Sequence, residues 1–260
     1  TRRGLPAAHV QLAARHAANH GRGDADAFGR SGAILLGDLL LAWAVELADA
    51  SGAERLAQAQ PLLAAVRAEV AAGQYLDVTA QGRALADVLN VPESVDEQIR
   101  RVVEFKTARY TVIRPLQIGA ALGGGSTELL DLLGRFGSPL GRAFQFRDDV
   151  LGVFGDAAVT GKPAGDDLRE GKLTVLVANA IARAPRAHAE QLAGLLGRPL
   201  SPDEVGQAQA IIVESGALAA AEAEIADAAA QALAVLDEQI AEPARTALRR
   251  LVVLATQRDA

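Results

Sequence analysis

The chain has 260 residues, a net charge of −6 and hydrophobic residues at half of its positions. Its length fits one large domain, or two, with a sizeable core, and its Ala- and Leu-rich sequence favours helices. The absence of Cys excludes disulfides and thiolate chemistry, and the acidic charge argues against a nucleic-acid partner. Because no secretory signal opens the chain, we expect a cytoplasmic protein.

The N-terminal region begins with Arg2 and Arg3 beside a turn. Adjacent arginines are usually solvated, but guanidinium groups can also clamp a phosphate. The chain starts at Thr1 without Met, and we expect residues upstream of it. Between Phe28 and Ala50 lies a helix that is apolar on nearly all sides, typical of a core or a subunit interface. Charged residues interrupt it, so we expect no stable membrane insertion.

The next predicted helix covers Pro61 to Ala80, with Pro61 in its first turn. It contains GQYLD, in which Asp77 either points into a polar cavity or lies on an ordinary amphipathic surface.

A longer helix is predicted over Pro92 to Gly119, with a kink at Pro115. Lys106 and Thr107 lie in an increasingly apolar stretch of it. A lysine in such a place either extends to the surface or serves a buried anion.

The helix predicted over Thr127 to Phe154 carries the most distinctive polar group. Asp148 and Asp149 emerge from apolar flanks, and Gln145 shares their face. Adjacent buried aspartates repel each other unless a cation joins them, so the pair indicates a divalent metal site. A solvated pair is the alternative. Asp156 lies about two turns beyond Asp149 and nearly aligned with it.

Gly155 to Gly171 is predicted to be a loop, either a lid or a plain connection. It carries Lys162, and Lys172 follows it. These two and Lys106 are the chain's only lysines, so each is a candidate for a site that needs a compact ammonium group.

The rest of the chain, from Leu173 to Ala260, is predicted to form four helices. The expected boundaries are Pro185, the stretch from Gly197 to Pro202, and Pro243.

Together these blocks resemble the trans-isoprenyl diphosphate synthases (polyprenyl synthetases), most closely the bacterial geranylgeranyl diphosphate synthases. TRRGLPAAH resembles the segment after the family's first Asp-rich motif, and GQYLD, FKTARYT, FQFRDDVLGVFGD, TGKPAGDD and LREGK follow in order. The resemblance implies an all-α bundle of long helices around a central apolar cavity. It implies a single domain over residues 1–260 that lacks the N-terminal helices and the first Asp-rich motif.

The implied activity is a prenyltransferase reaction. Isopentenyl diphosphate would be condensed with dimethylallyl, geranyl or farnesyl diphosphate to a longer trans-prenyl diphosphate, geranylgeranyl diphosphate. The implied cofactor is Mg²⁺, with about three ions around the bound diphosphate. A homodimer is also implied.

The resemblance assigns a role to each candidate residue. Arg2 would contact the allylic diphosphate and Arg3 the isopentenyl diphosphate, and Asp148 would bind Mg²⁺ and act in catalysis. The remaining residues that would contact diphosphate are Lys106, Thr107, Gln145, Lys162 and Lys172, of which the first three are also catalytic.

The resemblance gives the other acidic residues indirect or partial roles at the metal. Asp149 and Asp77 would hold metal-bound water. The family's second motif is commonly DDxxD, but its last position here is Gly152, which Asp156 could replace in part.

Two alternatives remain at this point. A catalytically silent subunit of the same fold would fit the missing first motif. A class I terpene cyclase would share the Asp-rich helices, but it would lack the RRG, KT and TGK blocks and carry more than 3% aromatic residues.

Overall fold

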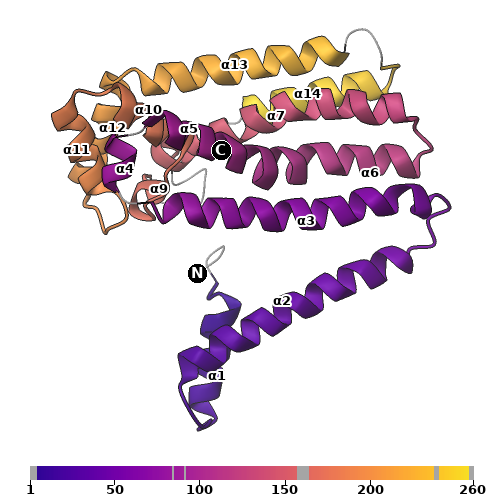
Figure 1. The fold of residues 1–260 in the computed structure, drawn as a ribbon, viewed down its shortest axis with the longest axis horizontal. Coiled ribbons are helices and arrows are strands. Elements are labelled where there is room, and N and C mark those ends of the chain that lie inside the picture. The colour runs from indigo at the N-terminus through magenta and orange to yellow at the C-terminus, as the bar shows by residue number, and fades with distance from the viewer. Residues whose placement is uncertain (1–4, 84, 91, 157–163, 237–239, 258–260) are drawn as a thin grey trace. The chain divides into compact units, whose positions relative to one another are not determined.

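The computed structural model describes residues 5–83, 85–90, 92–156, 164–236 and 240–257. Every regular element in these ranges is a helix, which confirms the predicted all-α fold. Contacts divide the chain into two compact units, Thr1–Leu56 and Ala57–Ala260, and each is described by itself (Figure 1). The predicted single domain therefore stays a prediction.

The first unit is a pair of packed helices, α1 (Ala8–Ala18) and α2 (Ala25–Asp49). α2 begins three residues before the expected Phe28, because Asp24 caps it by accepting a 2.6 Å hydrogen bond from the Ala27 N–H. The two helices meet closely at Gly29, where a Cβ atom would lie 2.3 Å from the His9 carbonyl oxygen.

Most of the apolar surface of α2 is exposed. Leu35, Trp43 and Leu47 are 68%, 52% and 75% exposed, and within the helix only Gly29 is buried. Within this unit the shorter α1 leaves most of α2 uncovered, and the expectation that α2 lies in a core or at a subunit interface stays a prediction. Among the described residues, α2 is also the one helix long and apolar enough to cross a membrane. Length and composition alone are weak evidence for a span.

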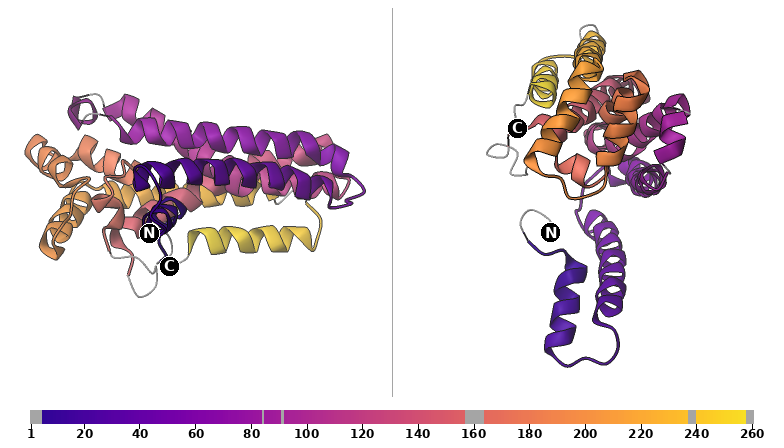
Figure 2. Two further views of the ribbon diagram at one scale, coloured as in Figure 1. Left: turned by 90° about the horizontal axis from the view of Figure 1, so that it is seen from below. Right: turned by 90° about the vertical axis from the view of Figure 1, so that its left-hand side faces the viewer.

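The second unit combines long and short helices. Figures 1 and 2 show the long helices lying side by side, and Figure 1 shows the short helices α4 (Leu85–Asn90), α9 (Asp166–Arg169), α11 (Arg186–Leu195) and α12 (Pro202–Glu214) gathered at one end. Phe136 and Leu140 of α7 (Thr127–Phe154) pack with Leu236 of α13 (Ala217–Leu236) and Val252 of α14 (Ala244–Thr256) in one buried cluster. The other helices are α3 (Leu56–Gln81), α5 (Pro92–Val102), η1 (Val103–Ile113), α6 (Arg114–Leu122) and α10 (Val175–Arg183).

Several predicted boundaries are confirmed. α7 has the predicted bounds, with Ser126 as its N-cap and Gly155 after its end. Pro185 and Pro243 are the N-cap residues of α11 and α14. The Gly197–Pro202 boundary separates α11 from α12.

Other predicted boundaries are wrong. α3 begins five residues before Pro61, which lies inside the helix. Because proline has no N–H, the helix loses one hydrogen bond there, close enough to its start to be tolerated. The region after Leu173 contains five described helices, not four, because Gly216 adopts a left-handed φ of 76° and separates α12 from α13. The predicted loop of residues 155–171 contains the short helix α9.

The predicted helix of residues 92–119 changes geometry twice. α5 is followed by η1, a π-helix of 11 residues, and then by α6. At the end of η1 the Arg114 N–H donates to the carbonyl of Arg109, five residues earlier. Pro115 follows at once in the first turn of α6, where the π-helix gives way to an α-helix, and the kink predicted at Pro115 stays a prediction.

Candidate active site

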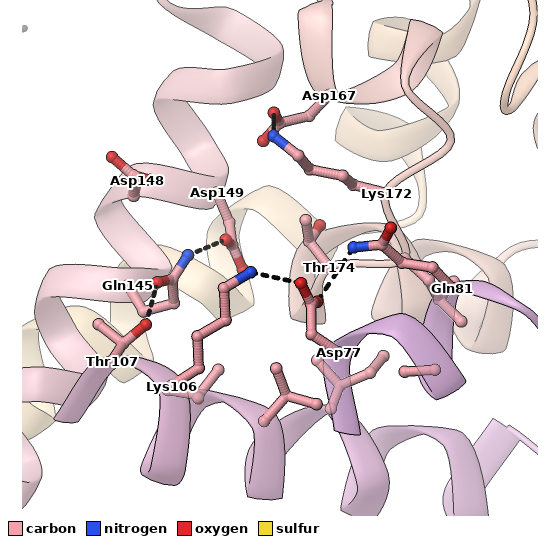
Figure 3. Close-up of a pocket in the computed structure, with 15 residues that line it drawn as sticks. Asp77, Gln81, Lys106, Thr107, Gln145, Asp148, Asp149, Asp167, Lys172 and Thr174 are labelled. Carbon is pink, nitrogen blue, oxygen red and sulfur yellow. Dashed lines mark hydrogen bonds and ion pairs between the residues drawn. The ribbon is translucent and has the colours of Figure 1, made fainter. Parts of the chain in front are cut away.

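A polar cavity of about 180 Å³ lies in the second unit (Figure 3). α3, η1, α7 and the segment that begins with α9 supply its walls. Both acidic and basic side chains enter it, so it suits a ligand that is anionic and held together with cations. Its polar lining consists of Asp77, Gln81, Lys106, Thr107, Gln145, Asp148, Asp149, Asp167, Lys172 and Thr174.

An ion pair between Asp77 and Lys106 joins α3 to η1 in this cavity. The second oxygen of Asp77 accepts a 3.1 Å hydrogen bond from Nε2 of Gln81. Lys106 therefore lines the cavity instead of extending to the surface. Asp77 lines the same cavity and does not lie on an ordinary amphipathic surface. The Asp77 carboxylate balances the charge of the lysine.

A hydrogen-bonded chain runs from η1 to α7 beside this pair. The Thr107 hydroxyl donates to Oε1 of Gln145 at 2.6 Å, and Nε2 of Gln145 donates to Oδ1 of Asp149 at 2.8 Å. Thr107 and Asp149 are both buried. The two partners fix the orientation of the Gln145 amide, since one requires its oxygen and the other its nitrogen.

The surroundings of Asp149 shift the pKa of its carboxyl group. Burial raises its pKa to about 7, and the negative charges of Asp167 and Asp148 add to the rise, against hydrogen bonds from Gln145 and from the backbone of Val175. A cation bound between these carboxylates would offset the repulsion among their charges.

Asp167 and Lys172 form the opposite wall of the cavity. Nζ of Lys172 lies 2.6 Å from Oδ1 of Asp167 and 2.8 Å from Oε2 of Glu170. Burial alone would lower the pKa of Lys172, but these two carboxylates raise it above its ordinary value. Sequence reasoning missed Asp167. Its place five residues before Lys172 in DDLREGK is the one signal that could have identified it.

η1 is held between its neighbours by close backbone contacts. A Cβ atom on Gly73 of α3 would lie 2.5 Å from the backbone nitrogen of Lys106, and one on Gly141 of α7 would lie 2.4 Å from Cα of Ala108. Real Cβ atoms do not approach backbone so closely, so both positions require glycine. These contacts set the position of the π-helical turn that carries Lys106 and Thr107.

A second polar network holds the far end of η1. Glu69 of α3 accepts hydrogen bonds of 2.7 Å from Arg109 and of 2.7 and 2.5 Å from Arg114. These bonds, with Arg114 contributing most, lower the pKa of Glu69. The network and the Asp77–Lys106 pair fix η1 to α3 at both ends.

The acidic side chains of the cavity are the candidate ligands for a divalent cation. Within the described ranges, no three acidic or histidine side chains form a group that could hold a metal by themselves. Mg²⁺ is usually held by one or two carboxylates, with water and substrate phosphates completing its octahedron. Asp148 and Asp149 on one wall and Asp77 on another therefore fit a metal that is shared with a diphosphate.

The structure thus brings most of the predicted site residues together. Lys106, Thr107, Gln145 and Lys172 line one cavity with the acids. Asp156 is exposed and does not line it. Arg2, Arg3 and Lys162 lie outside the described residues.

The chain is similar to known proteins along most of its length. Residues 1–240 match the model of the polyprenyl synthetase family. The chain is 34% identical over 229 residues to a geranylfarnesyl diphosphate synthase of Aeropyrum pernix, covering 85% of this chain and 62% of that protein. It is 33% identical over 264 residues to a short chain isoprenyl diphosphate synthase of Methanothermobacter thermautotrophicus, covering 99% and 72%.

A solved structure is similar along nearly the whole chain. It is a geranylgeranyl pyrophosphate synthase from Corynebacterium glutamicum complexed with isoprenyl diphosphate and magnesium. The TM-score is 0.86 and the identity 41%, over 99% of this chain and 72% of that one. The chain therefore spans roughly two thirds of the length of these relatives. From the family match and these identities, the chain belongs to the polyprenyl synthetase family.

Proposed function

We propose that the protein is a trans-isoprenyl diphosphate synthase. It condenses isopentenyl diphosphate with an allylic diphosphate and makes geranylgeranyl diphosphate. The observation that carries this proposal is that Lys106 and Lys172 line one cavity together with Asp148 and Asp149. Lysines and metal-binding acids in one place suit a diphosphate with its magnesium ions, and the similar proteins are named as isoprenyl diphosphate synthases.

Substrate binding would use the basic and amide groups of the cavity. Lys106, Thr107 and Gln145 would hold the allylic diphosphate, and Lys172 would close the site from the other wall. Lys106 is neutralised by Asp77 in this structure, so a diphosphate would compete with that carboxylate for the lysine. Arg2 would contribute to the allylic diphosphate, Arg3 to isopentenyl diphosphate, and Lys162 to closure.

Asp148 would ligate magnesium, and Asp149 and Asp77 would hold metal-bound water. The metal supplies charge neutralisation of the departing diphosphate. Lys106 and Lys172 stabilise the same negative charge as the allylic C–O bond breaks, because they are positioned before the reaction begins. The isopentenyl double bond then attacks the allylic carbon, and a proton passes to the released diphosphate as the new double bond forms.

The apolar part of the cavity would protect this reaction from water. Ile99, Val102 and Val103 line the cavity beside Lys106. An allylic cation would otherwise be trapped by water, so an aliphatic wall favours carbon–carbon bond formation.

The proposed enzyme is a homodimer in the cytoplasm. The exposed apolar side chains of α2 would be buried by a second copy, which supports a homodimer. The enzyme would act in the cytoplasm on its two diphosphate substrates.

The test uses the full-length protein. Isopentenyl diphosphate is supplied with dimethylallyl, geranyl or farnesyl diphosphate in turn, with and without Mg²⁺, and the products are sized. The proposal predicts magnesium-dependent elongation that ends at geranylgeranyl diphosphate. A folded protein that elongates no primer would contradict it and favour the catalytically silent subunit.

A further inference from the structure

Oppositely charged side chains are paired at two different spacings in the segment that runs from α5 into η1. On α5, Glu97 and Arg101 are four residues apart, and Nη2 of Arg101 lies 3.1 Å from Oε1 of Glu97. On η1, Glu104 and Arg109 are five residues apart, and Nε of Arg109 lies 3.1 Å from Oε1 of Glu104. The spacing of these charges therefore changes from four to five where the α-helix gives way to the π-helix.

Arg114 continues the five-residue series after Arg109, and both guanidinium groups bind one carboxylate. Glu69 of α3 accepts a 2.7 Å hydrogen bond from Nη1 of Arg109 and bonds of 2.7 and 2.5 Å from Nε and Nη2 of Arg114. The backbone joins the same two arginines, since the Arg114 N–H donates to the Arg109 carbonyl. The side chains of Glu69 and Arg114 are only 14% and 18% exposed, so solvent screens their contact little.

The five-residue spacing fits a π-helix and does not fit an α-helix. In a π-helix the backbone hydrogen bonds join residues five apart, so side chains five apart lie one above another. With 3.6 residues per turn, an α-helix would instead turn such side chains about 140° away from each other around the axis. Arg109 and Arg114 would then no longer face one shared carboxylate. The four side chains that meet here are called the charge ladder and are Glu69, Glu104, Arg109 and Arg114.

We propose that the charge ladder holds η1 in its π-helical form, and that Glu69 is thereby a positioning residue for Lys106 and Thr107. This inference rests on the proposed function. Lys106 lies eight residues before Arg114, so a change in the number of residues per turn alters the angle between their side chains. With Arg114 held on Glu69, an α-helical segment would turn Lys106 and Thr107 away from the partners that they have in the cavity. The ladder thus lies outside the cavity but sets the direction of two side chains inside it.

The experiment compares Glu69→Gln with Glu97→Gln in the full-length protein, each in the wild-type and in the Lys106→Ala background. Glu69→Gln keeps the size of the side chain but leaves two guanidinium groups facing an amide with a single acceptor oxygen. Glu97→Gln removes the exposed pair with Arg101 and is the matched control, because such pairs contribute little. Amide hydrogen exchange is measured by mass spectrometry, and kcat is measured with isopentenyl and farnesyl diphosphates.

Glu69→Gln should loosen η1 and slow the reaction through Lys106. Its amides at 107–114 should exchange about tenfold faster than in the wild type, as expected for the loss of a charged hydrogen bond, whereas those of α13 should not change. Its kcat should fall by about tenfold, because Lys106 is no longer held in place. In the Lys106→Ala background the same substitution should lower kcat by less than about threefold, since residues that act together are not additive. Glu97→Gln should match its parent in every measurement.

Two results would overturn the inference while leaving the proposed function intact. One is exchange at residues 107–114 of Glu69→Gln within about twofold of the wild type. The other is a kcat that Glu69→Gln lowers by the same factor in both backgrounds, as a merely structural role would. If Glu69→Gln does not fold, Glu104→Gln removes only the charge that pairs with Arg109 and decides the point by the same exchange comparison. A wild-type protein that elongates no primer would instead contradict the proposed function, and the exchange result would still decide whether the ladder holds η1.

Discussion

The Thr107 hydroxyl donates a 2.6 Å hydrogen bond to Oε1 of Gln145 and so joins the π-helix η1 to α7. Because the same amide donates to Asp149, the position of Gln145 in the cavity depends on Thr107. One hydroxyl thus links the segment that carries Lys106 to the helix that carries the acidic pair.

Removal of that hydroxyl should impair catalysis more than folding. Thr107→Val keeps the shape of the side chain but leaves Oε1 of Gln145 without its donor, which should cost about 1 kcal/mol of unfolding free energy. Turnover should fall by about tenfold to a hundredfold, because the amide loses its fixed orientation. Denaturant unfolding and steady-state kinetics measure the two effects. Thr107→Ser, which keeps the hydroxyl, is the matched control, and equal kinetics for the Val and Ser variants would disprove the link.

The glycines beside η1 provide a test of the close backbone contacts. Alanine normally stabilises a helix interior by up to about 1 kcal/mol relative to glycine. Gly73→Ala should instead destabilise the protein by about 1–3 kcal/mol, because its Cβ would lie 2.5 Å from the backbone nitrogen of Lys106. Turnover should also fall, since relief of the clash displaces Lys106.

Gly119→Ala on α6 is the control for this prediction. An added Cβ there meets no atom within 4 Å, so the intrinsic helix preference should decide and the variant should be at least as stable as the wild type. Thermal unfolding and elongation assays of both variants measure the contrast. A Gly73→Ala protein as stable and active as Gly119→Ala would show that the contact does not constrain η1.

The sequence predicted α7 well because its signals are local. Ser126 caps its start, Gly155 follows its end, and the apolar residues around Asp148 and Asp149 mark a site by their contrast. Other features depend on tertiary contacts that a sequence pattern does not reveal. The π-helical geometry of η1 goes with backbone contacts at Gly73 and Gly141, which are distant in the chain.

Asp167 shows the same limit within the candidate site. It was expected to lie in a loop, where an acid beside other polar residues carries no special signal. Its place in the cavity depends on the packing of α9 on α7 and on its hydrogen bond from Lys172, which no sequence pattern reveals. The exposed surface of α2 is a related case: its composition predicts burial, but its partner within the first unit covers little of it.

Asp149 should make the stability of the metal-free protein depend on pH. Its folded pKa is raised to about 7 from 3.8, so the folded state holds a proton that the unfolded state releases. The stability linked to this proton is complete below the unfolded pKa and is lost as the pH rises through the folded pKa. Between pH 5.5 and 7 the loss should amount to about 2 kcal/mol.

Asp149→Asn removes this titration and keeps an oxygen that can accept from Gln145. In the absence of metal, the variant should gain stability relative to the wild type as the pH rises from 5.5 to 8. Chemical denaturation at several pH values measures the difference. Asp131→Asn, at an exposed position of α7, is the control and should follow the wild type. A difference between Asp149→Asn and the wild type that did not change with pH would contradict the raised pKa.

The central claim is that the cavity between α3, η1 and α7 holds the reacting diphosphate, and the most direct test is pyrophosphate release by the full-length Lys106→Ala variant with isopentenyl and farnesyl diphosphates at saturation. Loss of this charge should lower kcat by about a hundredfold or more. The circular dichroism spectrum should remain helical, and Arg135→Ala, at an exposed position of α7, should keep the wild-type rate. A folded Lys106→Ala protein with the kcat of the wild type would contradict the account.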